Sequence, residues 1–334
     1  MNKNIFKNLL GKFPRCRIAV VGDLMLDVYV WGEASRISPE APVPVVRIKR
    51  RSCCLGGAAN VMRNVATLGG QVEAFGVIGD DQNGEKIADL LRGYGIAPEH
   101  LSIDTQRCTT EKQRVVAGSQ QLLRIDYEDT AAISQQIRET IAHELIAMMQ
   151  KAQLDAIIFE DYGKGLLEET MLQEIVDIAR QQGVITALDP KPGHLMQVNG
   201  LSVMKPNRKE AFEMAAILDK GPVDDATKDS DLRLVAEKLL QQWQPECLII
   251  SLAAQGMALF KQDGSMQLIP TKAREVFDVS GAGDTVIAAF TLALSAGAPA
   301  EIAAEIANHA AGIVVGKVGT VTITADELLE SFTA

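Results

Sequence analysis

The chain has 334 residues, of which 47% are hydrophobic and 23% charged, as in an ordinary globular protein of one or two domains. A formal net charge of −10 argues against a nucleic-acid partner, because such proteins carry basic stripes. The five cysteines form no CxxC pair and fit a reducing compartment. No segment has the roughly 20 apolar residues that cross a membrane, and the N-terminus does not resemble a signal peptide. We therefore expect a cytoplasmic protein without a membrane partner.

Short apolar runs alternate along the chain with segments of helical periodicity. Several of the runs end in a polar residue, as expected for buried parallel strands whose carboxyl ends form a ligand site. The alternation predicts an α/β fold with a mainly parallel sheet and helices on both faces. The predicted strands are 17–23, 74–79, 156–159, 184–188 and 247–250, and the predicted helices are 85–93, 133–152, 167–182, 231–242 and 283–296.

Two segments do not fit this alternation and predict antiparallel strands outside the parallel core. Residues 42–51 follow a proline-rich stretch, and residues 108–126 alternate polar and apolar side chains. A small sheet of this kind would cover a cleft or pair with another subunit, since exposed strand edges need cover. We therefore expect a β-strand lid and a homodimer.

The strongest chemical signal is the octet from Asp278 to Thr285, which contains Gly281-Ala282-Gly283-Asp284 and precedes a predicted helix. Small residues at a helix start let backbone N–H groups converge on an anion, and the helix dipole adds positive potential. Asp284 in the first turn could then take a proton from a nucleophilic hydroxyl. The alternative is a glycine turn with an aspartate near the helix cap.

Two further motifs point to a hydroxylated ligand. Gly56 and Gly57 precede Asn60 at a predicted helix start, where the backbone can approach a ligand and the amide can donate and accept. Asp23 and Asp27 follow the first strand and could accept hydrogen bonds from hydroxyl groups. The alternatives are tight helix–sheet packing for the glycines and a turn or cap for each aspartate.

Together these motifs resemble the ribokinase, or PfkB, family of carbohydrate kinases. The family signatures match Gly56-Gly57-Ala58-Ala59-Asn60 and the segment from Asp278 to Asp284, in the expected order and over nearly the whole chain. The resemblance implies a ribokinase-like three-layer fold with a small β-strand lid, formed by residues 1–334 as a single kinase domain. It also implies ATP and Mg²⁺ as phosphoryl donor and metal.

Further segments, among them 35–46, 120–126, 161–165 and 189–191, resemble the D-glycero-β-D-manno-heptose-7-phosphate kinase subfamily. That resemblance implies phosphorylation of heptose 7-phosphate at O1, within ADP-heptose and lipopolysaccharide inner-core biosynthesis. Kinases of this subfamily occur alone or as half of a bifunctional protein, and both remain open here. The alternatives are a kinase for another sugar phosphate and a non-catalytic sugar- or nucleotide-binding relative. A nicotinamide-dependent dehydrogenase would need a GxGxxG motif after the first strand, and Gly22 begins none.

The resemblance also implies roles for individual residues. Asp284 would be the base, and the backbone amides of residues 281–283 would form the anion hole. Asp161 would contact the sugar. Nucleotide and Mg²⁺ contacts fall on Asn207, Glu210, Ser251 and Gly256, although Asn207 and Glu210 also fit a helix capping box.

A sugar phosphate also needs cations at its far end. Arg124, Lys164 and Lys191 are the candidates for this clamp, and surface ion pairs are the alternative for each. Asp278 and Ser280 would hold a monovalent cation, K⁺, as in several members of the family.

Overall fold

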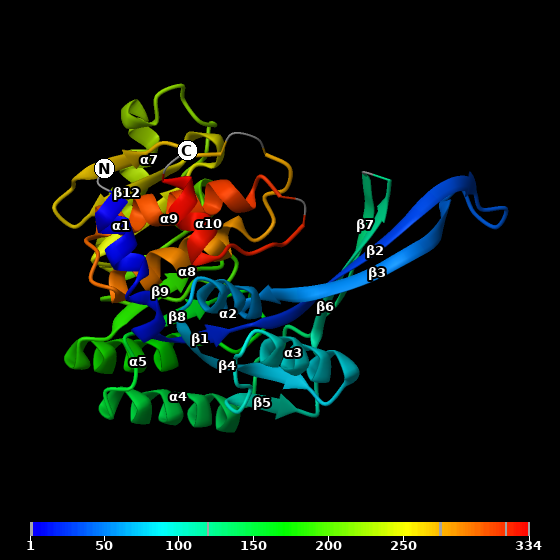
Figure 1. Cartoon of the computed structure of the whole chain (residues 1–334), viewed down its shortest axis with the longest axis horizontal. Helices are drawn as coiled ribbons and strands as arrows, with labels where there is room; N and C mark the ends of the chain where they lie inside the picture. Colours follow the sequence, from blue (N-terminus) through cyan, green and yellow to red (C-terminus); the bar gives the residue numbers. More distant parts are fainter. Residues whose placement is uncertain (1–2, 119, 274–275, 318, 333–334) are drawn as a thin grey trace.

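A nine-stranded sheet forms the centre of the molecule (Figure 1). The computed structural model describes residues 3–118, 120–273, 276–317 and 319–332. The strands run in the order β13-β12-β11-β10-β9-β8-β1-β4-β5, parallel from β11 to β5, with β12 and β13 antiparallel at one edge. Their bounds are β1 (Arg17–Gly22), β4 (Gln71–Gly79), β5 (Leu101–Asp104), β8 (Ala156–Glu160), β9 (Ile185–Asp189), β10 (Val203–Met204), β11 (Cys247–Ser251), β12 (Met257–Lys261) and β13 (Met266–Ile269).

Successive side chains of a strand point to opposite faces of the sheet, and here both sets are apolar. Helices therefore cover both faces. In β1, Ile18 and Val20 pack into the core on one face, whereas Ala19 and Val21 pack into the core on the other. The first face carries α1 (Lys3–Leu10), α2 (Ala58–Thr67), α3 (Gln82–Gly93), α8 (Ala282–Ser295), α9 (Ala300–Val314) and α10 (Ala325–Ser331). The second carries α4 (Gln135–Gln150), α5 (Glu169–Gln182), α6 (Arg208–Met214) and α7 (Ser230–Trp243). This arrangement confirms the expected three-layer α/β fold.

A second sheet of four strands, the one expected to serve as a lid and called the lid below, projects from the body (Figure 1). Its order is β3-β2-β6-β7, from β2 (Leu24–Ile37), β3 (Pro44–Gly57), β6 (Thr110–Ala117) and β7 (Gln120–Tyr127). Strands were expected at 42–51 and 108–126 and are found there. No strand was predicted at 24–37, where the structure has β2. Asp27 therefore lies within a strand and not in the loop that was expected.

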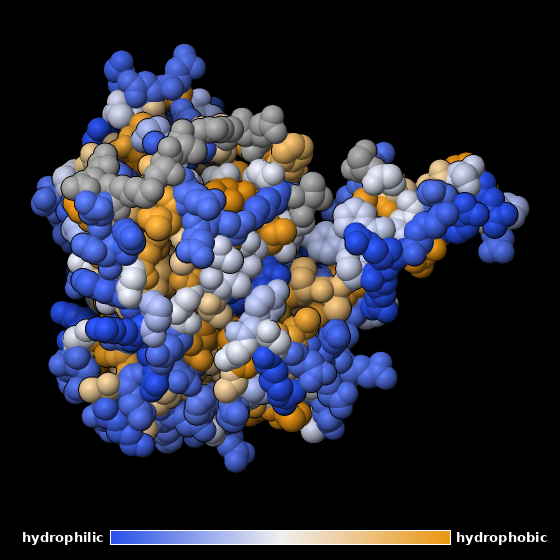
Figure 2. All heavy atoms as spheres, in the orientation of Figure 1, coloured by the Kyte–Doolittle hydropathy of each residue, from blue (hydrophilic) through white to orange (hydrophobic). Residues whose placement is uncertain are grey.

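Apolar side chains gather on the surface of the lid, where orange spheres interrupt the blue surface of the arm (Figure 2). The exposed apolar residues include Ile37 and Ile48 on β2 and β3, and Leu123 and Tyr127 on β7. On the opposite side of the body the first and last described helices meet, and the rings of Phe6 and Phe332 stack at 3.8 Å. Among the described residues, no helix combines the length and the apolar character required to span a bilayer.

Candidate active site

The glycine-rich motif forms the start of α8, as the sequence predicted. Gly281 is the residue before the helix and has φ of +78°, a conformation that favours glycine. A Cβ at this position would lie 2.8 Å from the amide nitrogen of Asn60, so a side chain would displace that amide. Asp284 follows in the first turn and is buried, with 6% of its surface exposed. The glycines therefore bring α2 and α8 into contact at the carboxylate of Asp284.

Both carboxylate oxygens of Asp284 accept a hydrogen bond. The Nδ2 of Asn60 donates to Oδ2 at 2.5 Å, and the Tyr162 hydroxyl donates to Oδ1 at 3.2 Å. Burial raises the pKa of Asp284 above its usual value, while these two donors and the cation of Lys205 act in the opposite direction. A carboxylate with a raised pKa and fixed geometry is suited to general-base chemistry near neutral pH.

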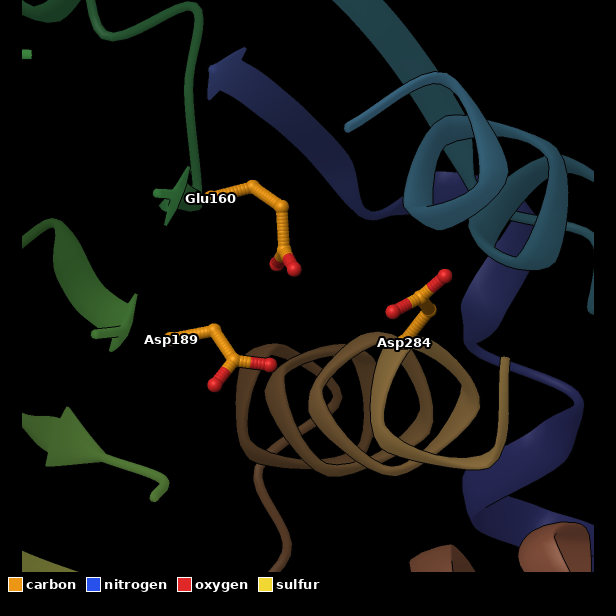
Figure 3. A group of neighbouring side chains, drawn as sticks. All are labelled: Glu160, Asp189 and Asp284. Atoms are coloured by element: carbon orange, nitrogen blue, oxygen red, sulfur yellow. The ribbon is translucent and has the colours of Figure 1, made fainter. Parts of the chain in front are cut away.

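Two more carboxylates point toward Asp284 from the ends of neighbouring strands (Figure 3). Glu160 ends β8 and Asp189 ends β9, and one oxygen of each lies within 4.8 Å of the others and of Asp284. Lys205 donates to this cluster, with Nζ 2.7 Å from the Asp189 carboxylate. Burial together with the nearby carboxylates of Asp189 and Asp284 raises the pKa of Glu160 well above its usual value. Three carboxyl groups thus lie together with Lys205, and their proximity makes it costly for all three to be ionised at once.

The predicted sugar-binding residues meet at the base of the lid. Gly57 has φ of +56°, and a Cβ there would lie 2.5 Å from the Asp23 carbonyl oxygen. A Cβ on Gly56 would lie 2.9 Å from the carboxylate of Asp27, so both glycines allow close contact between β3 and β2. Asp27 is buried and paired with Arg114, whose Nη1 lies 2.7 Å from Oδ1.

Asp23 and Asp161 organise the loop after β8. One oxygen of Asp23 accepts the backbone N–H groups of Tyr162 and Lys164, at 2.9 and 3.0 Å. Asp161 accepts the N–H of Gly163 at 2.8 Å and contacts His194 Nδ1 at 2.9 Å. These bonds hold the loop across the end of the sheet, close to Asp284.

The candidate clamp residues do not all converge. A cavity of about 450 Å³ beside Tyr162 is lined by Lys164, Lys191 and Arg138, with Lys164 also paired to Glu128 at 2.7 Å. Arg124 instead lies on exposed β7, where it forms an ion pair of 2.7 Å with its neighbour Asp126.

Lys112 is a further cation near this cavity, and the sequence analysis did not predict it as a phosphate-binding residue. Its Nζ lies 5.2 Å from the centre of the Tyr162 ring, and no carboxylate lies within 4.0 Å of it in the described ranges. Burial and repulsion from Lys164 lower the pKa of Lys112. Two cations thus lie close together near the cavity, where a bound anion would relieve their repulsion.

The predicted nucleotide-binding residues lie at the ends of β10 and β11. Asn207 and Glu210 form a capping box at the start of α6: Asn207 Oδ1 accepts the Glu210 N–H at 3.0 Å, and Glu210 Oε2 accepts the Asn207 N–H at 2.8 Å. Ser251 is bridged to Asn207 across the strand ends. Gly256 has φ of +92°, and a Cβ there would lie 2.1 Å from the Ile269 carbonyl oxygen. The capping-box interpretation is therefore confirmed.

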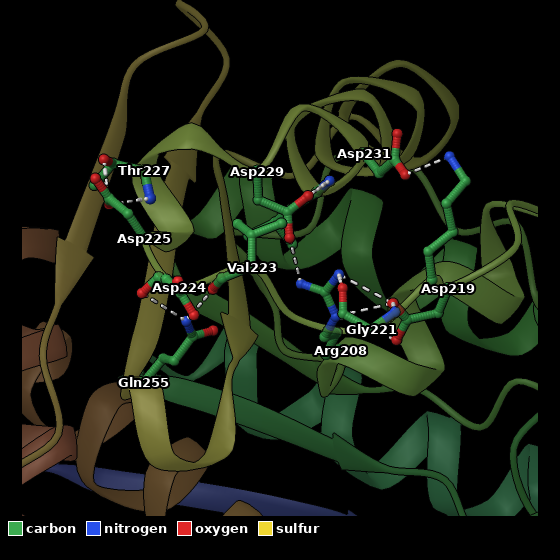
Figure 4. A network of polar contacts seen from close by, with 12 residues as sticks. Arg208, Asp219, Gly221, Val223, Asp224, Asp225, Thr227, Asp229, Asp231 and Gln255 are labelled. Atoms are coloured by element: carbon green, nitrogen blue, oxygen red, sulfur yellow. Dashed lines mark hydrogen bonds and ion pairs between the residues drawn. The ribbon is translucent and has the colours of Figure 1, made fainter.

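Arg208 fixes the segment that follows α6 (Figure 4). Its guanidinium binds both oxygens of Asp219, donates to Gly221 O at 3.0 Å, and reaches Asp229 Oδ2 at 2.7 Å. Asp229 in turn caps α7. One side chain thereby holds the connection between α6 and α7 next to the predicted nucleotide site.

The carboxylate of Asp278 binds backbone amides on both sides of the glycine motif. Its oxygens accept the N–H of Ser280 at 2.9 Å and of Gly319 at 3.1 Å. The Ala282 N–H bonds to the Val279 carbonyl at 3.2 Å. Asp278 therefore ties the start of α8 to the segment after α9.

A buried carboxylate at a glycine-rich helix start, facing a lid sheet across the carboxyl ends of parallel strands, defines a sugar kinase of the ribokinase-like type. The chain belongs to the pfkB family of carbohydrate kinases, whose profile matches residues 16–327. Among its relatives is the bifunctional protein HldE of Desulfatibacillum aliphaticivorans, 41% identical over 98% of this chain and 65% of that protein. HldE of Helicobacter hepaticus is also 41% identical, over 96% of this chain and 64% of that protein. The chain thus spans less than two thirds of the length of these relatives.

Solved structures of more distant proteins share the fold. Phosphofructokinase-2 from Escherichia coli, in complex with substrates and products, has a TM-score of 0.75 at 18% identity and covers 95% of this chain and 98% of that one. Ribokinase from Arabidopsis thaliana, with ribose and ATP, has a TM-score of 0.73 at 19% identity, covering 96% and 99%.

Proposed function

We propose that this carbohydrate kinase transfers the γ-phosphoryl group of ATP to O1 of D-glycero-β-D-manno-heptose 7-phosphate, giving the 1,7-bisphosphate. The buried Asp284, held by Asn60 and Tyr162 at the start of α8, carries the proposal of a kinase. The subfamily motifs and the HldE relatives support the heptose substrate. In this role the chain would act in the cytoplasm, in ADP-heptose synthesis for the lipopolysaccharide inner core.

In the proposed reaction Asp284 accepts the proton of the sugar hydroxyl as that oxygen attacks phosphorus. The oxygen–phosphorus bond forms while the bond to the ADP oxygen breaks, and the proton stays on the Asp284 carboxyl. Backbone amides of residues 281–283, with the Ala282 N–H released from the Val279 carbonyl, and the positive end of the α8 dipole would stabilise the transferring phosphoryl group. Positioning and charge stabilisation then supply most of the catalysis.

The oxygen donors at the nucleotide end suit Mg²⁺, which prefers carboxylate, carbonyl and water ligands. Glu210 lies in the first turn of α6 with its carboxylate fixed by the Asn207 N–H, and would orient the hydration shell of the metal. When bound, Mg²⁺ would neutralise charge on the phosphates of ATP. Ser251 and Gly256 would border the nucleotide.

The sugar would lie between the lid and the ends of β1 and β8, with Asp23, Asp27 and Asn60 near its hydroxyl groups. Its 7-phosphate would then meet cations near the cavity beside Tyr162. Lys164 lines that cavity, and Lys112 lies over the Tyr162 ring. A dianionic phosphate between two mutually repelling lysines gains charge-assisted hydrogen bonds and removes their repulsion.

The first experiment measures ADP release with Mg-ATP and a panel of heptose 7-phosphate, fructose 6-phosphate, fructose 1-phosphate and ribose. Turnover confined to heptose 7-phosphate is expected. Asp284→Asn should lower kcat by at least about 10²-fold, with ATP binding retained. Turnover of another sugar would overturn the heptose assignment, and near-normal turnover in the variant would remove Asp284 from its role.

The clamp is tested by Lys112→Met, which should raise KM for the sugar phosphate about tenfold or more and leave KM for ATP within about twofold. Lys49→Met is the matched control, because Lys49 is an exposed lysine of the lid paired with Glu33 at 3.4 Å. Equal effects on both substrates would refute the clamp.

We also propose that the lid pairs with a second copy of the chain. Its edge strands β3 and β7 pair with β2 and β6 on one side, and no strand of the described residues pairs with their outer sides. Ile48 and Tyr127 on these strands are 62% and 56% exposed. Burial of such edges is a common reason for dimerisation. Sedimentation at micromolar concentration should give a dimer, and a monomer would contradict the proposal.

A monovalent cation near Asp278 and Ser280 is the remaining expectation for the site. It rests on the resemblance to cation-dependent members of the family. Replacing K⁺ by tetramethylammonium should lower kcat, and equal rates in both salts would exclude the cation.

A further inference from the structure

Arg63 is a buried arginine near the candidate base that has no carboxylate partner. It lies on α2 with 4% of its surface exposed, and no Asp or Glu of the described ranges approaches its charged group within 4.0 Å. Its Nη2 donates to Asn60 Oδ1 at 2.7 Å and to the Thr320 carbonyl at 3.1 Å, while its Nε is buried without a partner. Burying an arginine this way is costly, so a compensating role is expected.

The chemistry of the guanidinium fixes the orientation of the Asn60 amide. Arginine can only donate hydrogen bonds, so the atom of Asn60 that faces Arg63 must be the carbonyl oxygen Oδ1. The amide nitrogen then faces Asp284, to which it donates at 2.5 Å. Asn64 Nδ2 also approaches Oδ1, but at 3.4 Å it is a weak substitute.

We propose that Arg63 is a positioning residue for the base, because it holds the Asn60 amide in the orientation that donates to Asp284. The inference rests on the proposed role of Asp284 and adds a residue that touches neither substrate. Without Arg63 the amide could rotate by half a turn and present its oxygen to the carboxylate. The two oxygens would then repel each other, so the ionised form of Asp284 would lose a donor and gain an unfavourable contact.

Other charged groups near Asp284 do not replace Arg63. Glu160 and Asp189 extend from β8 and β9, Asp27 lies on β2, and Lys205 follows β10. The Tyr162 hydroxyl, from the loop after β8, donates to the opposite oxygen, Oδ1. In the described chain, no bond joins any of these groups to the oxygen of the Asn60 amide.

Arg63 also binds a second segment, which lies next to Gly281 at the start of α8. The Thr320 carbonyl that it binds follows Gly319, whose N–H donates to Asp278 at 3.1 Å. The Thr320 side chain lies 3.0 Å from a Cβ placed on Gly281. The guanidinium of Arg63 therefore fixes the position of Asn60 relative to the backbone next to the proposed anion hole.

The test is the pH profile of kcat in Arg63→Met and Arg63→Lys, at saturating ATP and sugar phosphate. In the Met variant the acid limb should move upward by about one pH unit, which lowers kcat about tenfold on that limb and restores it in alkali. KM for ATP should stay within about twofold of wild type. Arg63→Lys keeps a cationic donor and should recover part of the shift.

Two controls separate positioning from a merely structural role. Arg208→Met removes a partly buried arginine that pairs with Asp219 and Asp229, and should lower Tm without moving the acid limb. In an Asn60→Ala background, the Arg63 substitutions should cause no further shift, since residues acting through one contact are not additive. If Arg63→Met does not fold, Arg63→Lys with and without Asn60→Ala carries the same test.

A wild-type acid limb in Arg63→Met, or equal shifts with and without Asn60, would overturn the inference. Failure of the proposed base would appear separately, as near-normal turnover in Asp284→Asn.

Discussion

Replacing Lys205 with methionine would leave the buried acidic cluster without the cation that contacts it. Lys205 is 3% exposed, and its Nζ lies 2.7 Å from Asp189, next to Glu160 and Asp284. Methionine fills a similar volume, so the main effect is electrostatic. Breaking a buried ion pair in this way costs about 3–5 kcal/mol.

That cost converts into a melting-temperature shift. Unfolding entropy is about 2.1 cal/mol/K per residue. For 334 residues this gives roughly 0.7 kcal/mol per kelvin, so Tm should fall by about 4–7 °C at pH 8.

The loss should depend on pH. Burial raises the pKa of Asp189 to about 7 even with Lys205 present, and removal of the cation would raise it further. A carboxyl whose pKa is higher in the folded state binds a proton that the unfolded chain has released. Its contribution to stability therefore falls as pH rises from the unfolded to the folded pKa. The difference between variant and wild type should be largest above pH 7 and smaller at pH 6.

Thermal unfolding followed by circular dichroism at pH 6 and pH 8 measures this effect. Lys220→Met is the matched control, because its ion pair with Asp231 involves a lysine that is 71% exposed, and Tm should change by less than about 1 °C. The double variant Lys205→Met, Asp189→Asn should recover part of the loss at pH 8. Equal losses at both pH values, or none at pH 8, would refute the electrostatic argument.

Three substitutions test other contacts of the site by the same thermal assay. Gly57→Ala should lower the free energy of unfolding by more than about 2 kcal/mol, because φ is +56° and the new Cβ would lie 2.5 Å from a carbonyl oxygen. Gly93→Ala is the control, since its Cβ would meet nothing within 4 Å and should not destabilise the protein. Similar Tm values for the two variants would contradict this prediction. Arg114→Met should lower the free energy of unfolding by about 3–5 kcal/mol, because it leaves the buried carboxylate of Asp27 unpaired. The exposed pair of Arg47 is the control, and Arg47→Met should cost less than about 1 kcal/mol. A larger loss for Arg47→Met than for Arg114→Met would exclude the buried pair as the cause. Glu160→Gln should raise Tm above that of the wild type, and by more at pH 8.5 than at pH 6. Burial raises the pKa of Glu160, so its ionisation at high pH destabilises the wild-type fold, and glutamine cannot ionise. The same gain in Tm at both pH values would argue against a destabilising ionisation of Glu160.

The parallel core could be predicted because its strands are buried on both faces and therefore read as short apolar runs. The polar residues that end them, such as Asp23, Glu160 and Asp189, follow from the same pattern. Strand β2 was missed although Leu24, Leu26, Val28 and Val30 alternate with other residues at the strand period. The two aspartates near its start suggested a loop, and the alternation was the signal that could have identified the strand.

The partners of Asp284 could not be read from local sequence. Asn60 was singled out as a sugar ligand, but its contact with Asp284 joins residues 224 positions apart. Arg63 and Lys205 are charged residues of the kind usually found on surfaces, and only the packing of α2 and the strand order show them buried. The orientation of Lys112 toward Tyr162 likewise depends on the register of β6 against β2.

The stacked rings of Phe6 and Phe332 bring the two ends of the described chain together on the side away from the lid. A short flexible linker could therefore join α1 to α10 without crossing the active site. New termini could then be opened in the turn between β2 and β3, at the tip of the arm, where residues 39–43 are exposed. Such a circular permutant would keep every strand of the parallel sheet in one covalent piece, and would make the lid the place where the chain begins and ends.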